Sequence, residues 1–235
     1  MKEERIGILV GASPLGCEKE YLKEILQSKD TVSVAADGGL SFFVKEKISP
    51  SFWIGDRDSV DPSSFEEAKT AFPELDLSPC PREKDDTDMR LGMITLKNLG
   101  VKKVLIFGGL GGDRLDHTIA NIQLLHEFAE EGIRAILVSE KEYLFVLTDG
   151  EEVVYPKEKE GILSVFSLED ETKVVIQGLK YEFEGSLSNK KVLGISNEFN
   201  GRGGRIFVSK GAALITRSTS LQSPESINAE ISGNL

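Results

Sequence analysis

Apolar and polar residues follow one spacing in roughly the first 140 residues of the chain and another spacing after them. Short apolar runs typical of buried strands alternate with stretches in which apolar residues recur at helical spacing. Asp61 followed by Pro62 is a typical helix start, and Gly100 and Gly132 are typical helix ends. The expected strands are 6–10, 31–35, 52–54, 103–107 and 133–138, and the expected helices are 18–28, 40–47, a helix from 62, 87–99 and 115–131. This alternation predicts an α/β fold, with a parallel sheet flanked by helices on both faces.

Helical spacing disappears near Asp149-Gly150. Short β-type runs separated by Gly and Asn follow at 153–155, 162–168, 174–176, 181–183, 206–208 and 213–216. Runs of this kind predict a smaller antiparallel sandwich or barrel. We therefore expect an α/β domain at 1–149, a β domain at 150–217 and a loosely ordered polar tail at 218–235.

Composition excludes several classes of protein. The 235 residues are 40% hydrophobic, which is enough for one large or two small cores. A net charge of −11 argues against general affinity for nucleic acid. Cys17 and Cys80 make neither a disulfide framework nor a zinc site, so we expect a reduced, cytoplasmic protein. No apolar stretch approaches the ~20 residues of a membrane span, and the first apolar run is too short for a signal peptide.

Four polar clusters follow expected strands, where ligands of parallel sheets bind. The segment 55–59 reads Gly-Asp-Arg-Asp-Ser, and its two carboxylates, Asp56 and Asp58, suit Mg²⁺, which prefers oxygen ligands. An ordinary acidic turn has the same composition. Asp37 is followed by two glycines at another strand end, which is also compatible with a simple turn.

The remaining two clusters lie at expected helix starts. In the segment 84–88, Asp85 and Asp88 share one helix face, although acids are favoured in any first helical turn. Lys84 is suited to contact a phosphate or to be solvated. The segment 108–117 carries four glycines, then Arg114, Asp116 and His117. Glycines and a helix start favour phosphate binding, but the spacing fits neither the Walker loop nor the dinucleotide-binding pattern.

Together the four clusters resemble the motif set of the thiamine pyrophosphokinase family. That set is Ala-Asp-Gly-Gly, Gly-Asp-x-Asp-Ser, Lys-Asp-x-Thr-Asp and a glycine-rich segment ending in Arg-x-Asp-His. This chain has the four motifs in order at 36–39, 55–59, 84–88 and 111–117. The Gly-Ile-Ser-Asn segment at 194–197 is similar to a further family motif. One departure is Asp113, which stands between the glycines and Arg114.

The resemblance implies a parallel α/β domain, a C-terminal β-sandwich and a homodimer that binds thiamine between its subunits. It implies transfer of a pyrophosphoryl group from ATP to thiamine, with Mg²⁺ as cofactor. The implied roles are Mg²⁺ ligation by Asp56, Asp58, Asp85 and Asp88; phosphate or nucleotide binding by Lys84, Gly111, Gly112, Arg114 and His117; catalysis by Asp37, Arg114 and Asp116; and thiamine contact by Ser196 and Asn197.

Two other functions fit the same residues. One is a different nucleotide-dependent transferase, such as a nucleotidyltransferase, that uses Asp-x-Asp and Mg²⁺. The other is a non-catalytic sensor of nucleotide or thiamine on the same fold. The acidic clusters argue against a sensor, because a sensor needs no such metal site.

Overall fold

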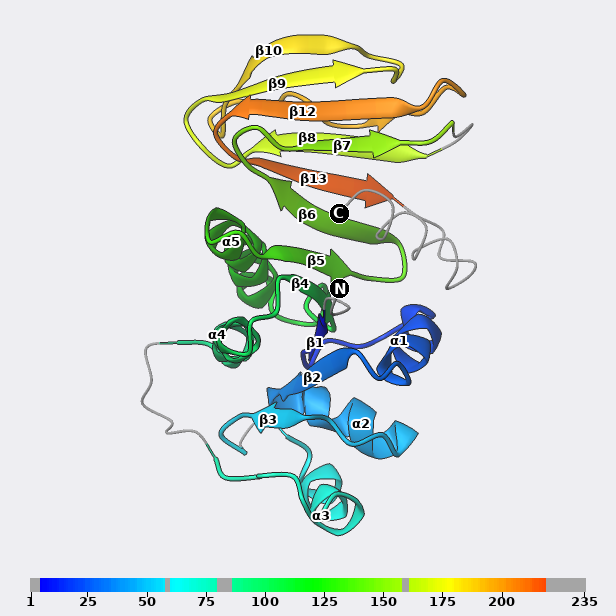
Figure 1. Ribbon diagram of the computed structural model, residues 1–235, viewed down its shortest axis with the longest axis vertical. Helices are drawn as coiled ribbons and strands as arrows, with labels where there is room; N and C mark the ends of the chain where they lie inside the picture. Colours follow the sequence, from blue (N-terminus) through cyan, green and yellow to red (C-terminus); the bar gives the residue numbers. More distant parts are fainter. Residues whose placement is uncertain (1–4, 58–59, 80–85, 158–160, 219–235) are drawn as a thin grey trace. The chain divides into compact units, whose positions relative to one another are not determined.

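The computed structural model describes residues 5–57, 60–79, 86–157 and 161–218 (Figure 1). By internal contacts the chain divides into two compact units, 1–124 with 137–139 and 125–136 with 140–235. Asp58, Lys84 and Asp85 lie outside the described residues. Within the part of the chain that is described, none of the helices combines the length and apolar character of a membrane span.

The first unit contains a parallel sheet in the order β4-β1-β2-β3. Helix α4 lies on one side of β1 and β2, and α1 and α2 lie on the other (Figure 1). The strands are β1 (Ile6–Val10), β2 (Thr31–Ala36), β3 (Phe52–Ile54) and β4 (Lys103–Phe107), and the helices are α1 (Glu18–Leu26), the 3-10 helix η1 (Asp37–Gly39), α2 (Leu40–Glu46), α3 (Pro62–Ala71) and α4 (Asp88–Asn98). The structure thus confirms the predicted parallel sheet with helices on both faces.

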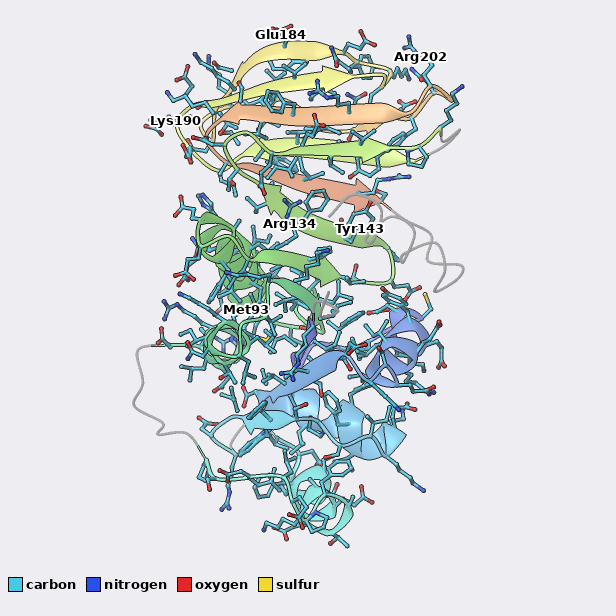
Figure 2. The ribbon with its side chains drawn as sticks, in the orientation of Figure 1. Met93, Arg134, Tyr143, Glu184, Lys190 and Arg202 are labelled. Atoms are coloured by element: carbon cyan, nitrogen blue, oxygen red, sulfur yellow. The ribbon has the colours of Figure 1, made fainter. Side chains whose placement is uncertain are left out.

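Burial explains why these segments fold in this way. The central strand β1 buries Ile8, Leu9 and Val10 completely, as expected for a strand covered on both faces. Helix α4 contributes Met93, which is fully buried (Figure 2). Helix α3 starts as its sequence predicts, because the Asp61 side chain accepts a hydrogen bond from the Ser64 amide at 2.9 Å.

The strands of the second unit pair antiparallel in two sets, β11-β8-β13-β6, which belongs to a nine-stranded sheet, and the separate four-stranded sheet β10-β9-β12-β7. Alternate residues of β9 and β12 are buried, the pattern of sheets with one covered face. The strands are β6 (Glu142–Leu147), β7 (Glu152–Tyr155), β8 (Ile162–Ser167), β9 (Thr172–Gln177), β10 (Phe183–Leu187), β11 (Asn197–Glu198), β12 (Gly204–Lys210) and β13 (Ala213–Ser218). Helix α5 (Leu115–Glu130) and strand β5 (Arg134–Val138) contribute residues to both units.

Two expectations for the strands were wrong. The strand expected at 181–183 begins at Phe183, because the Asn197 side chain binds the Tyr181 amide at 3.0 Å and the Tyr181 carbonyl at 2.7 Å. These backbone groups are therefore used by a side chain rather than by a strand partner. Strand β6 was missed, although five of its six residues are buried in an unbroken run, the pattern of the predicted strands β1 and β4.

Candidate active site

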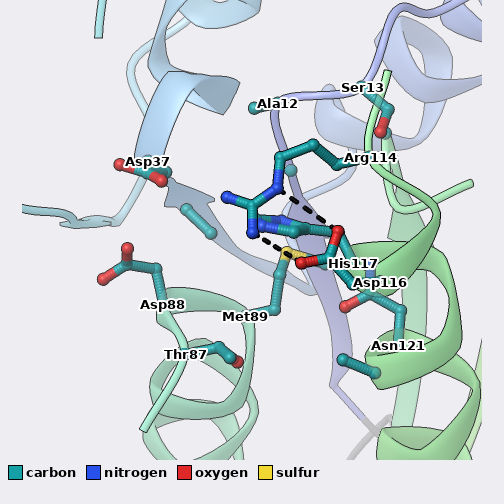
Figure 3. Close-up of a pocket in the computed structure, with 14 residues that line it drawn as sticks. Ala12, Ser13, Asp37, Thr87, Asp88, Met89, Arg114, Asp116, His117 and Asn121 are labelled. Atoms are coloured by element: carbon teal, nitrogen blue, oxygen red, sulfur yellow. Dashed lines mark hydrogen bonds and ion pairs between the residues drawn. The ribbon is translucent and has the colours of Figure 1, made fainter. Parts of the chain in front are cut away.

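A cavity of about 350 Å³ lies in the first unit, where β1, β2 and β4 end. Figure 3 shows Asp37 and Asp88 on one side of it, and Arg114, Asp116 and His117 on the other. The polar side chains that line the cavity are Ser13, Asp37, Thr87, Asp88, Arg114, Asp116, His117 and Asn121. Three of the four motifs recognised in the sequence therefore contribute residues to one cavity.

Asp37 occupies a constrained position directly after β2. Its backbone has φ 54°, in the left-handed region that non-glycine residues rarely adopt. The Trp53 indole on β3 donates a hydrogen bond to the Asp37 carbonyl at 3.3 Å and helps to hold this conformation. Such strain is found where the surrounding structure over-determines the backbone, often at functional sites.

Asp88 is placed by the start of α4. The Thr87 hydroxyl caps the helix by accepting a hydrogen bond from the Arg90 amide at 3.2 Å. The Arg90 guanidinium also pairs with Asp86 at 2.5 Å, one turn earlier. The Thr87 cap and the Arg90–Asp86 ion pair fix the backbone of the first helical turn. This fixed backbone places the Asp88 carboxylate at the cavity.

Arg114 and Asp116 form an exposed ion pair at the cavity. Nε and Nη2 of Arg114 donate to the two carboxylate oxygens at 3.2 and 2.5 Å. This hydrogen bonding lowers the pKa of Asp116 below its usual range and raises the pKa of Arg114. Asp116 therefore stays ionised near neutral pH and orients the guanidinium at the mouth of the cavity.

The glycine-rich loop after β4 is tied to its surroundings at three points. The Ser13 hydroxyl donates to the Gly111 carbonyl at 3.2 Å, and the Asn121 amide on α5 donates to the Gly109 carbonyl at 2.8 Å. A Cβ added at Gly108 would lie only 2.5 Å from the Gly11 carbonyl oxygen. The loops after β1 and β4 therefore meet backbone to backbone, which only glycine permits.

The structure gathers some of the predicted site residues and separates others. Asp37, Asp88, Arg114, Asp116 and His117 line the cavity, whereas Asp56, Gly111 and Gly112 do not. The residue before Asp56 lies beside Asp37, because a Cβ added at Gly55 would be 3.2 Å from the Asp37 Cα. Asp113 is exposed and does not line the cavity.

Ser196 and Asn197 lie in the second unit. Ser196 is exposed with φ 55°, and its amide donates to the Ser164 hydroxyl at 3.0 Å. Asn197 is buried, and its amide holds the Tyr181 backbone from both sides. Ser196 is thus accessible to a ligand, whereas Asn197 shapes the segment that presents it.

Sequence reasoning missed several cavity residues. Ser13, Met89 and Asn121 line the cavity but belong to none of the recognised motifs. The signal for Asn121 was a polar residue among the apolar positions of a helix. A neighbouring cavity of about 240 Å³ shares residues 11–13 and contains two lysines, Lys19 and Lys45.

Comparison with known proteins gives consistent matches along the chain. The family model "Thiamin pyrophosphokinase, catalytic domain" matches residues 23–137, and "Thiamin pyrophosphokinase, vitamin B1 binding domain" matches residues 151–213. The curated thiamine pyrophosphokinase of Bacillus subtilis (strain 168) is 27% identical over 191 residues, which cover 80% of this chain and 88% of that protein.

Solved structures agree with these matches. Thiamin pyrophosphokinase from Geobacillus thermodenitrificans is 26% identical with a TM-score of 0.78, covering 92% of this chain and 99% of that one. The Bacillus subtilis enzyme gives 24% identity and a TM-score of 0.80, with coverage of 92% and 100%, and the yeast enzyme gives 17% and 0.75, with coverage of 93% and 87%. The last two likenesses show the fold alone. With the two family models side by side along most of its length, the chain belongs to the thiamine pyrophosphokinase family.

Proposed function

We propose that this protein transfers the pyrophosphoryl group of ATP to the hydroxyl of thiamine, giving thiamine diphosphate and AMP. Membership of the family implies a diphosphotransferase that makes thiamine diphosphate. The observation that supports this reaction most directly is the cavity that brings together Asp37, Asp88, Arg114 and Asp116. Such a transfer depends on positioning and charge stabilisation more than on covalent chemistry of the protein.

The donor groups at the cavity fit Mg²⁺. Asp37 and Asp88 line it, and Asp56 follows Gly55, which lies beside Asp37. Carboxylate oxygens are the ligands that Mg²⁺ takes from proteins, usually one or two at a time. We assign Asp56, Asp58 and Asp88 as ligands, and Asp85 either as a further ligand or as a group that contacts the bound ligands without touching the ion. When bound, Mg²⁺ would offset the charge of the ATP phosphates.

The other cavity residues would orient the phosphates and the attacking hydroxyl. Asp116 engages two donors of Arg114, and the planar guanidinium has further N–H groups for phosphate oxygens. Gly111 and Gly112 both have positive φ, 74° and 79°, a conformation that can turn backbone amides toward an anion. We place His117 and Lys84 at the nucleotide phosphates, and Asp37 beside the reacting atoms without assigning a general base.

The second unit would supply thiamine contacts. We propose that residues 1–149 carry the ATP and Mg²⁺ site, that 150–217 bind thiamine through Ser196 and Asn197, and that 218–235 form a tail. Beside Ser196 the apolar side chains of Val192, Leu193 and Ile195 are 85%, 51% and 47% exposed. Their exposure supports a homodimer in which this surface meets a second subunit. The cytoplasmic location stays a prediction from cysteine usage.

Product analysis tests the reaction. With thiamine, ATP and Mg²⁺, the protein should release AMP and thiamine diphosphate. A nucleotidyltransferase would instead release pyrophosphate and a nucleotidylated product, and a sensor would bind without turnover. Asp56→Asn and Asp88→Asn should each lower kcat by about 10²–10³, by analogy with other single electrostatic groups. Asp113→Asn is the matched control, because Asp113 is exposed outside the cavity. Near-normal turnover in both Asp56→Asn and Asp88→Asn contradicts the metal assignment.

The subunit proposal needs its own measurement. Light scattering under assay conditions should give about twice the mass of one chain. Ile195→Glu should shift the mass toward that of the monomer and reduce activity, because a buried unpaired charge is costly at an interface. Full activity of a monomer at nanomolar concentration would exclude a thiamine site shared between subunits.

A further inference from the structure

A group of side chains that could hold a metal ion lies in the second unit, and none of them lines the cavity of the first unit. His126 and Glu130 stand four residues apart on α5, and Glu169 lies in the turn between β8 and β9. One imidazole nitrogen and two carboxylate oxygens from these residues all lie within 4.8 Å of one another. None of the three residues belongs to the motifs of the proposed reaction.

The distance between His126 Nε2 and the nearest Glu130 carboxylate oxygen matches the distance between two ligand atoms bound to the same metal ion. His126 Nε2 lies 3.5 Å from a Glu130 carboxylate oxygen. A direct hydrogen bond would bring these atoms to about 2.7–3.2 Å. Two ligands at ~2.1 Å from a tetrahedral ion are about 3.4 Å apart. His126 Nε2 is also shielded from solvent and makes no hydrogen bond within the part of the chain that is described.

The charge of the helix end favours a cation at the same place. Glu130 is the last residue of α5, and the last turn has no basic residue. A helix C-terminus carries partial negative charge, so carboxylates there are unfavourable. A divalent cation between His126 and Glu130 would offset this repulsion.

Both segments that carry the ligands have a fixed backbone. The Glu169 carbonyl accepts hydrogen bonds from the Ser167 hydroxyl at 2.8 Å and from the Asn189 amide at 2.9 Å. The Glu169 carboxylate lies over Gly211, where an added Cβ would be 3.1 Å from Oε2. After α5, the Gly132 amide closes the helix onto the Ala129 carbonyl at 2.9 Å. The backbones that carry the ligands therefore start from defined positions.

We propose that His126, Glu130 and Glu169 bind one divalent transition-metal ion of the Zn²⁺ type. An imidazole combined with carboxylates suits Zn²⁺, whereas Mg²⁺ prefers oxygen ligands alone. Water completes the coordination, because the three side chains leave one tetrahedral position. The ion would connect the end of α5 to the β8–β9 turn, through residues that the proposed reaction does not use.

The test uses the two histidines of the chain, His117 and His126, whose imidazole nitrogens can be followed by ¹⁵N NMR. Excess Mg²⁺ is added first to occupy the carboxylates of the ATP cavity, and ZnCl₂ is then titrated. The His126 signals should shift and saturate near one equivalent of Zn²⁺, while the His117 signals stay unchanged. Signals of His126 that do not move, or that move only with those of His117, would overturn the proposal.

Variants assign the remaining ligands. Glu169→Gln should weaken Zn²⁺ binding at least tenfold and abolish the Zn²⁺-dependent rise in Tm. Asp170→Asn is the matched control, because the neighbouring Asp170 is exposed and pairs with Lys190 at 2.9 Å. It should bind Zn²⁺ like the unaltered protein. Equal Zn²⁺ affinity in Glu169→Gln and Asp170→Asn would show that only an ordinary His–Glu pair is present, even if His126→Gln failed to fold.

Discussion

The hydrogen bond from Asn121 to Gly109 connects the stability of the first unit to the shape of its cavity. Asn121 is 7% exposed, and its side-chain amide donates to the Gly109 carbonyl at 2.8 Å. Gly109 is itself buried, so few other donors can reach its carbonyl. The same loop leads to Arg114, which lines the cavity. Replacing Asn121 should therefore affect both folding and ATP use.

The expected size of the effect follows from the unpaired carbonyl. Asn121→Ala removes the donor and leaves a buried acceptor, which costs about 1–3 kcal/mol of unfolding free energy. In a protein of this size 1 kcal/mol shifts Tm by about 2–4 °C, so a middle value of ~2 kcal/mol corresponds to roughly 4–8 °C. Asn121→Asp should cost as much or more, because it places a carboxylate oxygen against the carbonyl.

Thermal and urea unfolding measure the loss, with Gln123→Ala as control because Gln123 is an exposed amide on the same helix. Steady-state kinetics should show a larger fall in kcat/KM for ATP than for thiamine, since the glycine loop carries Arg114. Unfolding of Asn121→Ala at the same urea concentration as Gln123→Ala would refute the reasoning. An Asn121→Asp variant as stable as the unaltered protein would show that the side-chain oxygen, not the nitrogen, faces Gly109.

Three further outcomes are expected. Burial, with a smaller contribution from Glu24, raises the pKa of Tyr21 to about 12, so the absorbance titration should include a tyrosine component that ionises late. Because the unfolded chain loses that proton near pH 10, the unfolding free energy should fall between about pH 10 and 12; four tyrosines titrating together near 10 would contradict this. Gly39→Ala should cost at least about 1–3 kcal/mol, since its Cβ would meet the Val10 carbonyl oxygen at 2.0 Å, and unchanged urea unfolding would rule out that contact. Arg114→Gln should raise the pKa of Asp116 toward its usual value in a carboxyl ¹³C NMR titration, and an unmoved midpoint would show that the guanidinium does not control it.

Local signals in the sequence were sufficient for most elements. Asp61 and Pro62 marked the start of α3, and Gly100 and Gly132 marked the ends of α4 and α5. These residues act through their own backbone or through groups within one turn, so a single sequence contains the information. The gathering of Asp37 and Asp116 was predictable in outline, because parallel strands bring their carboxyl ends to one edge.

What the sequence did not show depends on contacts between distant segments. Tyr181 has strong β propensity, yet its backbone is bound by the Asn197 side chain, sixteen positions further along. Ser13 reaches the glycine loop across a separation of 98 residues. No local pattern encodes either contact. The motifs therefore predicted neither the residue at which β10 starts nor the presence of Ser13 in the cavity wall.

The backbone contact between the loops after β1 and β4 limits how this cavity can be redesigned. A Cβ at Gly11 would lie 2.6 Å from the Gly108 carbonyl oxygen, so this part of the cavity wall tolerates no side chain. The backbone approach of the two loops requires glycine at both positions. A library aimed at a new phosphate donor should therefore leave both glycines alone and vary Ala12, Met89 and Ala120, which also line the cavity. The positions open to redesign are therefore these three side chains, while the two glycines that hold the loops together stay fixed.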